Sequence, residues 1–184
     1  VIGDGELDLI NDAELPSVIY TIFTKLGFSN FTIRINNRKI LNGLFESLNQ
    51  KEKAVEILRI IDKIDKIGKD AVIEELEKIE VEKEAVKKII EFISINGTSD
   101  EKIEKLKKLN IENETYIKGV EELEYVVKHM RMFEIPENNF NVDLTIARGL
   151  DYYTGTVYET FLNDYRELGS VCSGGRYENL AEYY

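Results

Sequence analysis

Residues 148–159 read RGLDYYTGTVYE, a turn that joins two stretches with strand periodicity. Apolar and polar side chains alternate from residue 140 to 146 before the turn and from residue 156 to 161 after it. This period of two residues predicts two half-buried strands. Arg148 would therefore lie at the end of a strand, where loops on a rigid sheet commonly present groups to a ligand.

Residues 1–50 predict the tail of a strand, a helix, a strand and a second helix. Asn11 to Glu14 resemble a capping box, and Pro16 falls in the first turn of the helix that follows, where its missing N–H costs little. The apolar residues at helical spacing are Leu15, Val18, Ile19, Ile22, Phe23 and Leu26. Residues 31–35 alternate as a strand, and residues 40–48 repeat as a helix.

Residues 51–112 predict several short amphipathic helices with lysine and glutamate faces. The breaks between these helices are expected at residues 68–70, 80–82, 96–100 and at Asn110, with Asp70 and either Ser99 or Asp100 as N-caps. A longer helix is expected from Tyr116 to Phe133, ending before Pro136.

These elements together predict an α+β fold with an antiparallel sheet, flanking helices and an inserted all-helical module. The order of strands and helices favours this class over alternating α/β units. The sheet-bearing domain would comprise residues 1–50 and 138–184, and the helical module residues 51–137. The chain opens on Val1 rather than Met, in a stretch that reads like the end of a strand, so we expect a piece of a longer protein.

The composition disfavours several classes of protein. The chain has 184 residues and a formal net charge of −11, which disfavours unspecific binding to nucleic acid or to anionic membranes. Residues 51–112 carry 13 Lys and one Arg against 16 Asp and Glu, so this segment repels a polyanion less than the rest. The single cysteine allows no internal disulfide, and no long apolar run or leader is present, so a cytoplasmic protein without a membrane segment is expected.

The candidate side chains also have purely structural interpretations. Arg148 suits a phosphate or carboxylate ligand, but a salt bridge to Asp143 or Asp151 would also satisfy it. Tyr152 and Tyr153 are adjacent, so in extended backbone they would point to opposite faces.

No metal site is predicted. Cys172 is expected to be a small buried filler, and His129 lies near the end of a helix, where packing or pairing with the helix dipole explains it. One histidine and one cysteine, without a carboxylate signature, argue against a zinc site.

Three strings extend the prediction beyond periodicity. Residues 147–155 (ARGLDYYTG) closely resemble the first histidine-specific motif of histidyl-tRNA synthetases, and residues 170–180 (SVCSGGRYENL) resemble the second. Residues 33–43 (IRINNRKILNG) are similar to the strand and helix after the second class II motif in the archaeal and eukaryotic branch of that family. The chain thus resembles an internal part of a class II aminoacyl-tRNA synthetase, with its insertion domain.

The resemblance implies a catalytic core that activates histidine with ATP and Mg²⁺ and transfers it to tRNA(His). Arg148 would be the catalytic residue at the α-phosphate, and Arg176 would lie beside the adenylate. The histidine pocket would comprise Tyr152, Tyr153, Gly174, Gly175 and Tyr177, with Tyr153 as the partner of the imidazole. The helical module would approach the tRNA acceptor arm, and the whole enzyme would be a homodimer.

The same resemblance implies that other parts of the active site are missing. The first and third class II motifs, the arginine of the second and the anticodon-binding domain do not occur in this sequence. We therefore expect that the chain alone is inactive and binds no cofactor tightly. The alternative is a noncatalytic synthetase-like protein, such as a regulatory subunit of ATP phosphoribosyltransferase or a tRNA-binding module.

Overall fold

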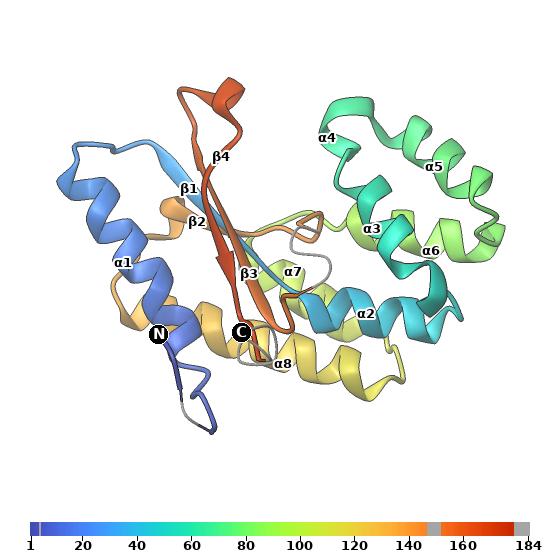
Figure 1. Ribbon diagram of the computed structural model, residues 1–184, viewed down its shortest axis with the longest axis horizontal. Helices are drawn as coiled ribbons and strands as arrows, with labels where there is room; N and C mark the ends of the chain where they lie inside the picture. The colour runs from blue at the N-terminus through green and yellow to red at the C-terminus, as the bar shows by residue number, and fades with distance from the viewer. Residues whose placement is uncertain (4, 147–151, 179–184) are drawn as a thin grey trace.

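The computed structural model describes residues 1–3, 5–146 and 152–178. Its sheet has the strands β1 (Phe31–Asn37), β2 (Phe140–Val142), β3 (Thr156–Leu162) and β4 (Ser170–Gly175), in the order β2-β1-β3-β4 (Figure 1). β1 and β4 both pair with β3 in the antiparallel sense, whereas β2 runs parallel to β1. The long helical connection between β1 and β2 brings the chain back to the same end of the sheet, which a parallel pair requires. The α+β fold is confirmed, with one parallel pair at its edge.

The strand predicted over residues 140–146 ends early, at Val142. The Asp143 carboxylate accepts hydrogen bonds from the backbone N–H of Thr145 at 3.0 Å and from its hydroxyl at 2.6 Å. Such a local side-chain turn competes with the strand. Leu144 and Ile146 stay buried beyond the turn, so the alternation marked their burial correctly although the backbone leaves the sheet.

Two long helices pack beside the sheet: α1 (Asn11–Lys25) and α8 (Glu114–Met132), with α2 (Arg38–Ser47) against α8. The aromatic rings of Tyr20 and Phe23 on α1 lie 5.9 and 5.2 Å from the ring of Phe31 on β1. Because α8 contacts α1, α2 and β1, it joins residues 11–47 to the later part of the chain in one hydrophobic core.

α1 differs from its prediction in three ways. The N-cap is Ile10 without a side-chain hydrogen bond, so the predicted capping box is wrong, and Pro16 lies inside the helix rather than in its first turn. The predicted core face is also split. Phe23 packs against the core, whereas the exposed members are Leu15, Val18, Ile22 and Leu26, with Leu26 69% exposed.

The helical segment contains α3 (Ala54–Ile61), α4 (Ile64–Ile67), α5 (Lys69–Lys78), α6 (Lys83–Ile93) and α7 (Ser99–Lys108). One-turn 3-10 helices occupy Lys51–Lys53, Glu137–Asn139 and Arg166–Leu168. All four predicted breaks are confirmed, but the caps differ. Gly68 precedes α5 with a φ of 81°, and Thr98 caps α7 in a capping box with Glu101, in place of Asp70 and Ser99 or Asp100. Among the described residues, no helix is long and apolar enough to cross a membrane.

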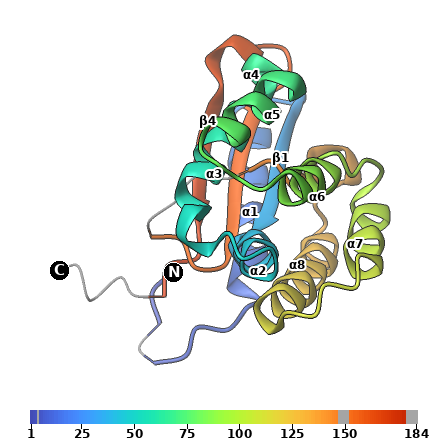
Figure 2. The same ribbon diagram turned by 90° about the vertical axis from the view of Figure 1, so that its right-hand side faces the viewer.

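α2 and α8 lie side by side and approach closely through a glycine on each helix (Figure 2). A Cβ atom on Gly43 would lie 2.3 Å from the backbone nitrogen of Tyr116, and one on Gly119 would lie 2.7 Å from that of Ile40. Both obstructing atoms belong to backbone, which cannot rotate away. The glycines therefore set the spacing between the helix that follows β1 and the helix that precedes β2.

We predict that Gly43→Ala destabilises the protein by about 2 kcal/mol, because the added methyl group forces α2 and α8 apart. Helix propensity alone predicts the opposite sign, since alanine is favoured over glycine within a helix by roughly 0.5–1 kcal/mol. Urea denaturation would measure the change, with the exposed Ser47→Ala on α2 as control. A gain in stability for Gly43→Ala would contradict the close crossing.

Candidate functional site

The two motif segments meet at one end of β3 and β4. The backbone N–H of Thr154 donates to the carbonyl oxygen of Arg176 at 2.9 Å, and the N–H of Arg176 donates to the carbonyl oxygen of Thr156 at 2.8 Å. The N–H of Arg38 donates to the carbonyl of Gly155 at 2.9 Å, so the start of α2 holds the same turn. Residues far apart in the sequence thus form one backbone-bonded unit.

Three tyrosines gather on this unit. The ring centroids of Tyr152 and Tyr153 are 4.4 Å apart, and those of Tyr152 and Tyr177 are 5.5 Å apart, both in edge-to-face geometry. The prediction that Tyr152 and Tyr153 point to opposite faces is therefore wrong. That prediction assumed extended backbone, whereas Tyr152 lies in a turn and β3 begins only at Thr156.

The paired glycines of β4 differ in their surroundings. A Cβ atom on Gly175 would lie 2.8 Å from both the Tyr153 ring and the carbonyl oxygen of Thr156, so only glycine fits beneath that ring. A Cβ atom on Gly174 would meet nothing within 4 Å in the described part of the chain. Gly175 is thus required by packing, while the need for glycine at position 174 does not come from packing within these residues.

The Tyr153 phenol is held in its neutral form. Partial burial, and then the neighbouring Tyr152, raise the pKa of Tyr153 to about 12. The hydroxyl group therefore keeps its proton at neutral pH and can donate a hydrogen bond to a ligand or accept one from it.

Arg176 is held by contacts within the protein. Its guanidinium group donates to the Asp12 carboxylate at 2.9 Å and to the carbonyl oxygen of Leu7, and lies 3.5 Å from the Glu178 carboxylate. The side chain is only 11% exposed. This arrangement ties β4 to α1 and to the N-terminal segment.

Asp12 is the centre of a buried network that the sequence interpretation missed. Its carboxylate also accepts a hydrogen bond from the Thr156 hydroxyl at 2.7 Å, and burial raises the pKa of Asp12 despite the nearby Arg176. The Tyr158 hydroxyl donates to the backbone carbonyl of Asp12. That carbonyl would normally accept from the N–H of residue 16, which Pro16 lacks. The sequence signal for this network is Pro16, because a proline four residues after Asp12 leaves the Asp12 carbonyl without its helical donor.

Other candidates fall outside the tyrosine cluster. Arg148 and Asp151 lie outside the described residues, and Asp143 pairs with Arg34 at 2.9 Å. Cys172 is half-buried, and this burial raises the pKa of its thiol. His129, in the last turn of α8, stacks on Tyr125 and bonds to its carbonyl oxygen at 2.8 Å. The described residues contain no group of three or more metal-ligating His, Cys, Asp or Glu side chains.

Comparison with known proteins places these features in one family. The family model described as histidyl-tRNA synthetase matches residues 1–184. The histidine–tRNA ligase of Clostridium tetani is 58% identical over 184 residues, which are all of this chain and 42% of that enzyme. The chain therefore spans less than half the length of this relative.

Two solved structures share the fold. The crystal structure of histidyl-tRNA synthetase from Nostoc sp. PCC 7120 is 47% identical with a TM-score of 0.94, over 98% of this chain and 43% of that one. An ATP phosphoribosyltransferase regulatory subunit/histidyl-tRNA synthetase from Bacillus halodurans C has a TM-score of 0.81 over 99% of this chain and 46% of that one, but only 23% identity, which shows the fold alone. The similar sequences from Clostridium tetani and Nostoc are bacterial, so the predicted archaeal and eukaryotic branch is not supported.

We predict that Tyr158→Phe destabilises the protein by roughly 1–3 kcal/mol, because it leaves the buried Asp12 carbonyl without a donor. In a Pro16→Ala background the cost should be smaller, since an alanine at this position restores the helical N–H. Chemical denaturation of the four proteins of this double-mutant cycle would measure the coupling. An equal cost of Tyr158→Phe in both backgrounds would refute it.

Proposed function

The chain belongs to the histidyl-tRNA synthetase family, and we propose that it forms part of a histidine–tRNA ligase. The complete enzyme would activate histidine with ATP to histidyl-adenylate and transfer the histidyl group to tRNA(His). The observation that carries this proposal is the match over all 184 residues, including both motif segments, which bond to each other through Thr154 and Arg176.

The tyrosine cluster would form one wall of the histidine pocket. Tyr153, with its neutral phenol, would bond to the imidazole. Tyr152 would support the ring of Tyr153, and Tyr177 would support that of Tyr152. Gly175 lets the Tyr153 ring lie on β4, and the unobstructed space at Gly174 supports its assignment to the pocket floor. A pocket that hydrogen-bonds the substrate discriminates strongly against analogues that lack the bonding group.

Arg148 would supply the positive charge at the α-phosphate. A fixed cation next to the reacting phosphorus stabilises the charge that develops in the transition state. Arg176 would lie beside the adenylate, with its guanidinium group bound to Asp12. The described residues contain no cluster of carboxylates that fits Mg²⁺, so we assign none of them to the metal that accompanies ATP.

The remaining parts of the proposal concern the whole protein. Residues 51–137 would form the insertion domain and approach the tRNA acceptor arm, between core segments 1–50 and 138–184. We propose a cytoplasmic homodimer whose dimer interface, first and third class II motifs and anticodon-binding domain lie outside this chain. Without those parts the isolated chain would be inactive. A regulatory role is less well supported, because the relatives with 47% and 58% identity are ligases, whereas the 23% match shows the fold alone.

We predict that Arg148→Ala in the full-length enzyme lowers the rate of histidine-dependent ATP–pyrophosphate exchange by about 100-fold or more. The KM for histidine should change little, because the charge acts mainly in the transition state. Arg59→Ala, on the exposed side of α3, is the matched control. Unchanged turnover with weakened histidine binding would show that Arg148 has a binding role instead.

We predict that Tyr153→Phe raises the KM for histidine about tenfold and leaves the KM for ATP nearly unchanged, because one hydrogen bond to the imidazole is lost. Tyr165→Phe, on the exposed hairpin between β3 and β4, is the control. Steady-state exchange kinetics with each substrate varied in turn would measure both constants. A parallel rise in the two KM values would contradict the pocket assignment.

A further inference from the structure

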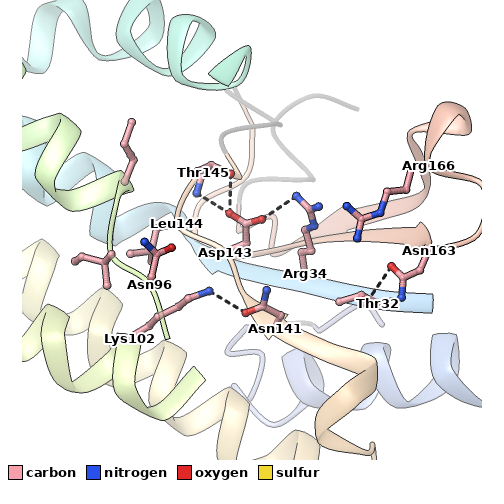
Figure 3. Close-up of a pocket in the computed structure, with 12 residues that line it drawn as sticks. Thr32, Arg34, Asn96, Lys102, Asn141, Asp143, Leu144, Thr145, Asn163 and Arg166 are labelled. Atoms are coloured by element: carbon pink, nitrogen blue, oxygen red, sulfur yellow. Dashed lines mark hydrogen bonds and ion pairs between the residues drawn. The ribbon is translucent and has the colours of Figure 1, made fainter. Parts of the chain in front are cut away.

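A polar cavity lies between the sheet and the helical segment, away from the tyrosine cluster. Its volume is about 330 Å³, at the lower end of the range for small-ligand sites. It is lined by β1, by the turn after β2, by the hairpin between β3 and β4, and by α7 together with the segment between α6 and α7. Thr32, Arg34, Lys102, Asp143, Asn163 and Arg166 line it (Figure 3).

The cavity lies further along the strands than the tyrosine cluster. Arg34 stacks over the ring of Phe161, with its guanidinium carbon 4.3 Å from the ring centroid. Gly175, beneath Tyr153, pairs with Val157, which lies on the same strand as Phe161. Four residues of strand separate these positions, or roughly 13 Å.

Asp143, the one carboxylate among the described residues of the lining, is already hydrogen-bonded through both of its oxygen atoms. Asp143 accepts from Arg34 through one oxygen atom and from the N–H and hydroxyl of Thr145 through the other. Lys102 uses two of its three N–H donors on the side-chain oxygen of Asn141 and the carbonyl of Val142, at 2.9 and 2.5 Å. Burial, partly offset by Asp143, lowers the pKa of Lys102, and the positive charge of Arg34 adds to this effect.

Arg166 brings a third cation to the same space. Within the described residues its guanidinium group has no hydrogen-bonded or ion-paired partner, and in Figure 3 it points toward the guanidinium group of Arg34. Among the described residues of the lining, three cations and one carboxylate give a net charge of +2, in a chain of net charge −11. Like charges that face one another repel, and an anion placed between them removes that cost.

We propose that this cavity binds a phosphate group, held by Arg166 and Arg34 with Lys102 at its side. Guanidinium groups match the tetrahedral oxygen atoms of phosphate with paired N–H donors. The phosphate could belong to a small ligand such as pyrophosphate or to the backbone of an RNA strand; the recognition chemistry is the same. Because the lining comes from both the sheet and α7, a bound phosphate would also fasten the helical segment to the sheet. Neither the cavity nor its charge depends on the proposed function.

Isothermal titration of the full-length protein at low ionic strength tests this site, with inorganic pyrophosphate and short single-stranded RNA as separate probes. Arg166→Gln should weaken the binding of one of the two probes at least tenfold, and Arg166→Glu should weaken the binding of that probe further. Arg59→Gln is the matched control, because it makes the same charge change on the exposed side of α3. Thermal denaturation should give wild-type stability for all three variants, since neither arginine side chain has a partner among the described residues.

The two probes distinguish the source of the phosphate. If Arg166→Gln loses affinity for pyrophosphate alone, the phosphate belongs to a small ligand. If it loses affinity for RNA, and pyrophosphate competes with RNA for the wild-type protein, the phosphate belongs to an RNA backbone. Wild-type affinity of Arg166→Gln for both probes would overturn the proposal. Equal losses in Arg166→Gln and Arg59→Gln would also overturn it, because they would show a general charge effect rather than a site.

Discussion

The buried ion pair between Asp12 and Arg176 is the interaction on which the candidate site depends. It joins the first turn of α1 to the residue that follows β4, across 164 positions of sequence. Removing one partner from such a pair leaves a buried charge uncompensated, at a cost of about 3–5 kcal/mol. Thr156 and Tyr158 bond to the same aspartate, so the start of β3 is held by the same residue.

This network also explains why α1 tolerates a proline in its interior. Pro16 removes the N–H that would satisfy the Asp12 carbonyl, and the Tyr158 hydroxyl takes its place. The cost of an interrupted helix is offset by a bond that connects the helix to the sheet. The hydrogen bond that Pro16 removes from α1 is therefore replaced by one that connects α1 to β3.

The sheet carries two regions of different chemistry. At one end, Tyr153 over Gly175, with its neutral phenol, suits a small ligand that is recognised by hydrogen bonds. At the other end, Arg34, Lys102 and Arg166 form a cationic cavity at the boundary with the helical segment. The close crossing of α2 and α8 through Gly43 and Gly119 holds the helices at either end of the helical insertion against each other. The position of the helical segment over the sheet thus depends on these two glycines.

Local patterns in the sequence determined the strands and helices after residue 10 and four of the breaks between the helices of residues 51–112, but they wrongly gave a strand tail at residues 1–3 and missed the break between α3 and α4. These properties depend on periodicity, on glycine and asparagine at breaks, and on short motifs, all of which act within a few residues. Only the tertiary structure decided that Arg176 binds Asp12, that Tyr152 and Tyr153 share one cluster, that four of the six apolar residues on the predicted face of α1 are exposed, and that β2 is parallel to β1. The physical reason is that the partners of these groups are distant in the chain, and an arginine or a tyrosine pairs with whatever group the fold brings beside it.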